Sequence, residues 1–376
     1  MTAGAGVAVA AAGRLAVSDS AAADSTTNPA GAPTGARAFA MNSPSKGWAG
    51  LGDVVNQDTS TTLQSIAFDS VNGHLYTLQV AGASSLAYQR GGKEVARTLQ
   101  ISGPQHDAAG DLCLSRHDIA NGEVLDYMYL LGFGHGVSLG IEPAKEGTPA
   151  YVWTEAGADT QGYGREIARF PFAAGGVLWT SHPLVQRLAP PEPGAVQISP
   201  SVDATYGSLV LRYAAGGSFW FAAHDLAAAR AAAVEGKDLP ATPLAKVRQP
   251  LVHQAGADGK DTAKPATFQG FTAHGQYVYM LDGTPRTGSA SAPLAGEDLY
   301  AVHTTSIDLN GTANDPETGY MQRTHSAADA NADPREPEGM AVHTGPAGPR
   351  LCFGITDNAP DGTRRFDLYY KDGLMP

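Results

Sequence analysis

A short motif recurs five times along this chain, and this repetition constrains the fold more than any other feature. Each copy has an anchor residue, then a small residue, a large apolar residue and another small residue. The copies are LQSIAFD (63–69), GHGVSLG (134–140), SPSVDAT (199–205), FQGFTAH (268–274) and PEGMAVH (337–343). Their anchors are Gln64, His135, Pro200, Gln269 and Glu338, at spacings of 71, 65, 69 and 69 residues. Near-constant spacing over four intervals indicates a structural repeat.

Two further strand-like runs follow each copy, rich in β-branched and aromatic residues and bounded by Gly, Asn, Asp or Pro, which is the strand signature. The second strands are expected at 74–80, 151–157, 208–214, 277–283 and 350–356. The third strands are expected at 85–90, 165–172, 218–226, 297–309 and 364–372. The Ala-rich segment 222–240 predicts the one clear helix, as an insertion on one face.

These repeats predict an all-β fold, a five-bladed β-propeller with four strands in each blade. The repeats are longer than a usual blade, so the loops between strands must be long. The motif belongs on the innermost strand, because small residues let these strands crowd around a narrow axis. The large apolar residue would point into the packing between blades.

The last repeat has no room for a fourth strand before Pro376. Propellers close their ring to hide strand edges, so we expect the segment 38–55 to supply the missing outer strand. The first and last blades are then neighbours, within one domain that spans 37–376. Cys113 and Cys352 would lie on adjacent blades, where either a disulfide or two free buried thiols is possible.

The segment 1–36 is Ala/Gly-rich and then Ser/Thr/Pro-rich. A weak apolar stretch at 7–12 and small residues at 21–23 resemble a secretory signal, although the expected basic start is missing. We therefore expect a secreted, extracellular protein, with a disordered tail as the alternative interpretation. No stretch of 18 apolar residues is present, so no membrane span is expected.

The formal net charge of −12 argues against a nucleic-acid partner, which requires a basic face. It leaves an anionic ligand open, because a local arginine cluster can override the global sign. Neither zinc-ligand spacing nor a calcium loop is present, so no metal or other cofactor is expected. We expect a monomer.

The stretches GFGHGVSLGIEP, YVWTE, REIARFPF, LVLRY and REPEGMAV together resemble secreted actinobacterial proteins called teichoic acid biosynthesis protein C. Those proteins are similar to the propeller domain of certain staphylococcal phage receptor-binding proteins. The resemblance covers roughly residues 45–376. It implies a five-bladed propeller that contacts an extracellular or cell-wall glycan, and it establishes no reaction.

Four anchors are polar, and as the first residues of inner strands they should ring one mouth of the central channel. Gln64 and Gln269 are candidate ligand-binding residues. His135 would bind or protonate a ligand, or it caps a turn. Glu338, with Glu336 beside it, would be an acid or base, or it would fasten the last blade to the first.

Trp153 and Glu155 lie two apart on a predicted strand and share one face, which suits sugar binding. In the alternative, Trp153 is a core residue and Glu155 pairs with Arg165 or Arg169. Arg169 itself is a candidate clamp for a carboxylate or phosphate.

Arg212 lies in the otherwise apolar run LVLRY. An unpaired buried charge is costly, so it requires a carboxylate partner, such as Asp203, or an anionic ligand.

Two functions remain. The preferred one is a binding module that presents the channel mouth to an extracellular or cell-wall glycan, with an anionic, teichoic-acid-like polymer as the candidate ligand. The alternative is a glycan-cleaving enzyme, a polysaccharide lyase or glycoside hydrolase, with His135 and Glu338 as catalytic residues. Two carboxylates across an open pocket would favour hydrolysis. A His, Tyr and Arg arrangement without such a pair would favour a lyase, and mutually satisfied polar groups would favour binding.

Overall fold

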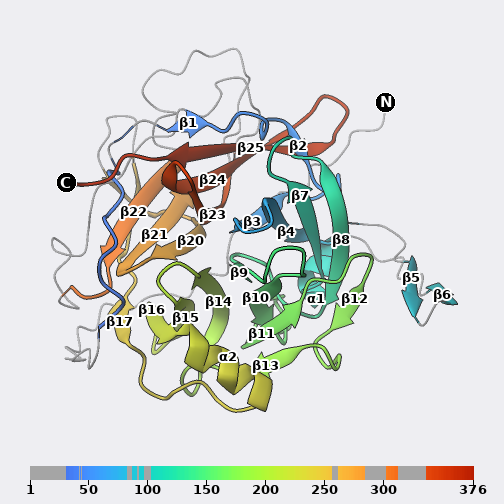
Figure 1. Ribbon diagram of the computed structural model, residues 1–376, viewed down its shortest axis with the longest axis horizontal. Helices are drawn as coiled ribbons and strands as arrows, with labels where there is room; N and C mark the ends of the chain where they lie inside the picture. The colour runs from blue at the N-terminus through green and yellow to red at the C-terminus, as the bar shows by residue number, and fades with distance from the viewer. Residues whose placement is uncertain are drawn as a thin grey trace.

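The computed structural model describes residues 31–41, 43, 45–82, 87–90, 93–96, 103–255, 261–283, 302–311 and 336–376. The protein is a five-bladed β-propeller, which confirms the predicted fold class. Five sheets surround a centre, and the strands nearest to it are β3, β9, β14, β20 and β23 (Figure 1). Most of the predicted segment 1–36 lies outside the described residues.

The first three blades follow in chain order. Blade 1 contains β3 (Leu63–Asp69), β4 (His74–Val80), β7 (Leu112–Asp118) and β8 (Val124–Leu131), and β12 (Val177–Trp179) pairs parallel with β8. Blade 2 contains β9 (Gly140–Glu142), β10 (Tyr151–Ala156), β11 (Glu166–Pro171) and β13 (Gln186–Leu188). Blade 3 contains β14 (Val196–Asp203), β15 (Ser208–Ala215), β16 (Ser218–Asp225) and β17 (Ala245–Arg248).

The last two blades complete the ring. Blade 4 contains, within the described residues, β20 (Phe268–His274), β21 (Tyr277–Gly283) and β22 (Val302–Asp308). Blade 5 contains β23 (Glu336–Gly345), β24 (Gly348–Asn358) and β25 (Arg364–Lys371), joined by β1 (Lys46–Gly47) and β2 (Val54–Val55). The remaining elements are the hairpins β5 (Ala87–Arg90) with β6 (Lys93–Ala96) and β18 (His253–Ala255) with β19 (Asp261–Pro265), and the helices α1 (Gly103–Ala109) and α2 (Leu226–Glu235).

The N-terminal segment closes the ring, as predicted from 38–55. β1 and β2 both pair antiparallel with β25, the outer strand of the last blade (Figure 1). Trp48, just after β1, packs between the two end blades: its ring lies 5.8 Å from that of Phe68 and 5.0 Å from that of His343. The apolar cluster beneath it contains residues of both blades, such as Leu63 and Phe366.

The repeated motif marks a β-bulge at the start of an inner strand. The pairing of β3 skips between Leu63 and Ser65, and that of β20 skips between Phe268 and Gly270. The small second residue is required there. A Cβ on Gly270 would approach Gly339 to 3.2 Å, and a Cβ on Gly339 would approach the backbone of Ser65 to 2.6 Å. The predicted crowding of inner strands is therefore present between blades 4, 5 and 1.

Two of the five motif copies are placed differently from the prediction. The inner strand of blade 2 is only β9, so 134–139 is a loop and His135 precedes the strand. Pro200 lies in the middle of β14. The pair that closes the hairpin begins seven residues after His135 at Glu142 and three residues after Pro200 at Asp203, whereas it begins five residues after the anchor in blades 1 and 4.

Two other predictions needed correction. The third strand of blade 1 is β7, whereas 87–90 forms the β5–β6 hairpin. The helix within 222–240 is shorter than predicted, because β16 continues to Asp225. The Asp225 carboxylate caps the helix by accepting from the Ala228 amide, and Gly236 ends it in the left-handed conformation.

Cys113 and Cys352 are both buried and free, in different apolar clusters. Among the described residues, no helix is both long and apolar enough to cross a membrane.

Candidate functional site

The candidate site lies at the end of the channel where the inner strands begin. Gln64 and Gln269 are the second residues of β3 and β20, and Glu338 is the third residue of β23. His135 lies in the loop that leads into β9. The predicted polar residues therefore gather at one end of the blades, except that Pro200 contributes no side chain there.

Glu155, the fifth residue of β10, is held beneath this mouth. Its side chain accepts hydrogen bonds from the backbone amides of Gly136, at 2.5 Å, and Gly164, at 2.7 Å. A Cβ on Gly134 would lie 2.2 Å from the Glu155 carboxyl carbon, so the loop needs glycine to reach the carboxylate. Burial raises the pKa of Glu155, and the two amide donors oppose that effect. Glu155 pairs with neither Arg165 nor Arg169, and it positions the loop that carries His135.

His135 contacts two partners from neighbouring loops. Its Nδ1 lies 3.1 Å from a carboxylate oxygen of Asp107, near the end of α1. Its ring centroid lies 5.3 Å from that of Tyr163, on the hairpin between β10 and β11. The side chain of His135 is 18% exposed, so the imidazole remains reachable from the mouth.

Arg212, the fifth residue of β15, is a buried cation without a carboxylate partner among the described residues. Its guanidinium carbon lies 3.9 Å from the ring centroid of Phe219 on blade 3 and 3.6 Å from that of Phe268 on blade 4. Its Nε donates to the Gln249 side chain at 2.7 Å. Burial lowers the pKa of Arg212 to about 9. The residue is only 6% exposed.

The predicted ion pair of Arg212 with Asp203 is absent. Asp203 lies at the opposite end of the blade, where its carboxylate accepts from the amides of Thr205, Tyr206 and Gly275. The alternative expectation for Arg212, an anionic ligand, therefore remains.

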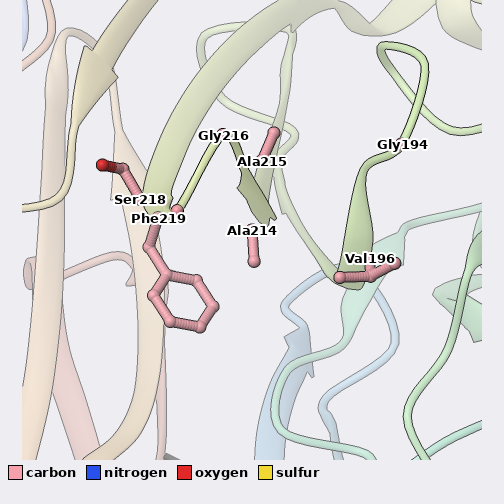
Figure 2. Close-up of a pocket in the computed structure, with 8 residues that line it drawn as sticks. Gly194, Val196, Ala214, Ala215, Gly216, Ser218 and Phe219 are labelled. Atoms are coloured by element: carbon pink, nitrogen blue, oxygen red, sulfur yellow. The ribbon is translucent and has the colours of Figure 1, made fainter. Parts of the chain in front are cut away.

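A pocket of about 160 Å³ lies at the β15–β16 hairpin of blade 3, and Phe219, which contacts Arg212, is one of its lining residues. Its lining is almost entirely apolar, and Phe219, Ala214 and Val196 surround it (Figure 2). Phe219 is shared between the two features, since its ring also stacks on the Arg212 guanidinium. An aromatic ring next to a cation can contact both the apolar and the charged parts of one ligand.

Glu336 and Glu338 begin β23 on the other side of blade 4. The Gln269 side chain donates to Glu336 at 3.3 Å. Glu338 is buried, with 5% of its surface exposed. Burial raises the pKa of Glu338 well above its ordinary value, and the neighbouring Glu336 raises it further. Among the hydrogen bonds between described residues, none joins the Glu338 side chain to blade 1, so its role in fastening the last blade to the first stays a prediction.

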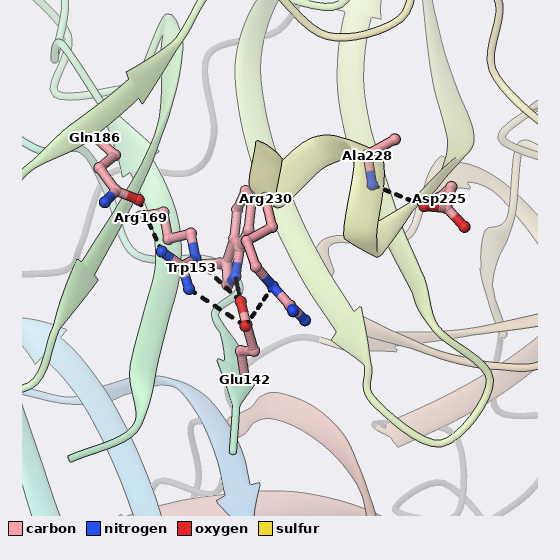
Figure 3. Close-up of polar contacts among 7 residues, drawn as sticks. All are labelled: Glu142, Trp153, Arg169, Gln186, Asp225, Ala228 and Arg230. Atoms are coloured by element: carbon pink, nitrogen blue, oxygen red, sulfur yellow. Dashed lines mark hydrogen bonds and ion pairs between the residues drawn. The ribbon is translucent and has the colours of Figure 1, made fainter. Parts of the chain in front are cut away.

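Trp153 and Arg169 belong to a structural cluster away from the mouth (Figure 3). Trp153 is fully buried and its Nε1 donates to Glu142, at 3.2 Å. Arg169 donates to both oxygens of Glu142, and Arg230 of α2 pairs with the same carboxylate at 2.6 Å. The Trp153 indole and the Arg169 guanidinium therefore already have partners within the protein. This agrees with the alternative interpretation, in which Trp153 is a core residue.

Several residues of the site were not predicted: Asp107, Tyr163, Phe219, Gln249 and Phe268. They lie on α1, on separate loops and at strand ends, so only the closed ring brings them to His135 and Arg212. Glycine-flanked Tyr163, in GYG, resembles GHG and was the one available signal. Among the described residues, no group of three or more His, Cys, Asp or Glu side chains could hold a metal ion.

No protein-family model matches the sequence, and no curated protein matches it. Among solved structures, the tail fiber of Staphylococcus aureus phage P68 is similar, with a TM-score of 0.55 and 15% identity over 87% of this chain and 52% of the fiber. This chain therefore spans about half the length of that fiber. At this identity the likeness concerns the fold alone.

Two other propellers are more distant. The Trypanosoma rangeli sialidase has a TM-score of 0.31 and 9% identity, over 86% of this chain and 57% of that chain. The Dos1 propeller has a TM-score of 0.35 and 10% identity, over 86% and 83%. These scores are too low to support a functional comparison.

Proposed function

We propose that this protein is a secreted propeller that recognises an anionic extracellular or cell-wall glycan at the mouth of its central channel. The observation that carries the proposal is Arg212, a buried guanidinium between two aromatic rings that has no carboxylate partner in the described part of the chain. Burying an uncompensated charge costs several kcal/mol. A ligand carboxylate or phosphate would offset that cost with paired, charge-assisted hydrogen bonds.

The surroundings of Arg212 favour a sugar over a simple anion. Phe219 lines an apolar pocket next to the guanidinium, and the apolar C–H face of a sugar ring can stack there. Gln249 fixes the guanidinium through Nε, which leaves its two terminal nitrogens to donate. Gln64, half-buried at the same mouth, is a further donor and acceptor for hydroxyl groups.

Teichoic-acid-like polymers are the first candidates, because residues 45–376 resemble the teichoic acid biosynthesis protein C group. Their phosphates and hydroxyls match the chemistry of Arg212 and its neighbours. Uronic-acid polymers present a carboxylate of the same charge and are the second candidate class.

Retention on immobilised glycans tests the proposal. The panel is a poly(glycerol phosphate) wall teichoic acid, glucuronan and neutral dextran, with the wild type, Arg212→Gln and Arg165→Gln. Arg165 is an exposed arginine on the β10–β11 hairpin and is the matched control. We expect retention on at least one anionic polymer, weakened about 10- to 100-fold in Arg212→Gln alone. Equal retention by Arg212→Gln and the wild type would overturn the assignment.

A further inference from the structure

We propose that the anionic glycan is a uronic-acid polymer and that the protein cleaves it by β-elimination, with Arg212 binding the carboxylate, His135 acting as the base and Tyr163 as the acid. This inference rests on the proposed function, because it uses the same arginine and the same mouth. It adds a reaction and a substrate class.

Three separate segments bring His135, Tyr163 and Asp107 together. His135 comes from the loop before β9, Tyr163 from the β10–β11 hairpin, and Asp107 from the end of α1. A Cβ on Gly162 would lie 2.2 Å from the Asp107 carbonyl oxygen, so the hairpin and α1 touch directly. Glu155 holds the His135 loop and the hairpin at once, through the amides of Gly136 and Gly164. The pairing of His135 with Tyr163 is thus built into the fold.

Asp107 prepares His135 to act as a base. Its carboxylate lies 3.1 Å from Nδ1, which fixes the proton on that nitrogen. The lone pair is then on Nε2, where it can accept a proton from a substrate carbon. Asp107 is a positioning residue, because it acts through His135.

The hairpin that carries Tyr163 reaches the strand next to Arg212: the Ile198 amide of β14 donates to the carbonyl of Gly164 at 3.1 Å, and the following Ser199 pairs with Arg212. The pKa of Tyr163 is raised by burial and by the carboxylates of Asp107, Glu155 and Asp159, whereas Arg212 lowers it. Tyr163 in turn raises the pKa of Arg212, so the two side chains interact electrostatically. The phenol is therefore protonated at neutral pH and available to donate a proton close to the Arg212 site.

The three groups match the demands of elimination from a uronate. Arg212 binds the C6 carboxylate and stabilises the negative charge that develops when C5 loses its proton. His135 Nε2 takes that proton, and the electron pair forms the C4=C5 double bond as the C4–O4 bond breaks. Tyr163 protonates the leaving O4. Proton exchange with solvent restores both residues, so no oxidant, reductant or added water is required.

Hydrolysis fits the geometry less well. Glu336 and Glu338 arise from one strand, two residues apart, and Glu338 is buried. A glycosidase needs two carboxyl groups on opposite sides of the scissile bond. The two glutamates do not flank an open cleft.

The experiment incubates the full-length protein with glucuronan and polygalacturonate oligosaccharides. It records ultraviolet absorbance of unsaturated uronate, product masses and, separately, binding. The variants are Tyr163→Phe and His135→Gln, with Tyr206→Phe as the matched control. Tyr206 packs on His274 at the other end of the blades. We expect unsaturated products with the wild type and with Tyr206→Phe, and a loss of at least about 100-fold in the other two, whose binding is retained.

The outcomes separate the two proposals. Binding without any unsaturated product overturns the elimination and leaves glycan recognition standing. New reducing ends without a double bond also overturn it, since they indicate hydrolysis. Undiminished elimination by Tyr163→Phe overturns the role of Tyr163. If the wild type binds no anionic polymer, the proposed function, recognition of an anionic glycan, is wrong as well.

Discussion

Glu155 and Arg212 are each the fifth residue of the second strand in consecutive blades, yet only one of them is satisfied by the fold. Two backbone amides hold the Glu155 carboxylate, whereas the Arg212 guanidinium has, within the described part of the chain, a single hydrogen bond, from its Nε to Gln249. The same position of the propeller therefore supports a loop in blade 2 and presents a charge in blade 3. The proposed recognition at the mouth depends on this difference.

A substitution at Gly164 tests whether the Glu155 carboxylate holds the β10–β11 hairpin. A Cβ at this position would lie 2.5 Å from the Cβ of Glu155, so Gly164→Ala must displace either the hairpin or the carboxylate. We expect a loss of about 1–3 kcal/mol in the free energy of unfolding, measured by urea denaturation. The control is Gly47→Ala, where a Cβ meets no atom within 4 Å. Equal stability of the two variants would show that Glu155 does not hold the hairpin.

Glu338 predicts a pH-dependent stability. Its pKa in the folded state is raised above the ordinary value of 4.5, so the folded state holds a proton that the unfolded state releases as the pH rises. The wild type therefore loses stability from about pH 4.5 upward, until the raised pKa is passed. Glu338→Gln abolishes this loss.

We expect Glu338→Gln to be about 1–3 kcal/mol more stable than the wild type at neutral pH, and equally stable below pH 4.5. Thermal melting across this pH range measures the difference. Exposed Glu123→Gln is the control and should follow the wild type. A difference between Glu338→Gln and wild type that does not change with pH would contradict the burial argument.

The Glu142 cluster should be important for stability and not for ligand binding. Glu142→Gln leaves buried Arg169 without its counter-ion, and Arg230 of α2 loses the same partner. We expect a loss of about 3–5 kcal/mol in the free energy of unfolding, with glycan affinity per folded molecule unchanged. Glu235→Gln, which removes an exposed pair with Lys237, should change stability by less than about 1 kcal/mol. Weakened glycan binding by the folded Glu142→Gln variant would contradict this assignment, because it would show that Trp153 and Arg169 belong to the binding site.

The blade count and the ring closure could be predicted, because each depends on a local pattern that repeats. Ser65, Gly270 and Gly339 are small for one reason, close approach at the axis, and that reason is visible in every correct copy. The second and third copies were misplaced for different reasons: in blade 2 a loop replaces the first part of the predicted inner strand, and in blade 3 the strand already begins at Val196, so Pro200 lies in its middle.

The pairing of charges could not be predicted. Arg212 was correctly singled out as a charge in an apolar strand. Its actual neighbours, Phe219, Phe268 and Gln249, come from two blades and a loop whose relative placement follows only from ring closure. Likewise, Arg169 on β11 pairs with Glu142 on β9, and not with Glu155 on the adjacent strand β10.

The most direct test measures whether Arg212 binds the negatively charged group of the ligand. The dissociation constants of wild type and Arg212→Gln are measured for a glucuronan oligosaccharide and for its carboxyl-reduced, neutral form. If the wild type binds only poly(glycerol phosphate), that polymer and neutral dextran replace this pair. We predict that reduction weakens wild-type binding about 10- to 100-fold and leaves Arg212→Gln unaffected, since its affinity for both forms is already low. An equal loss of affinity in both proteins on reduction, or no preference of the wild type for the charged form, would contradict the central claim.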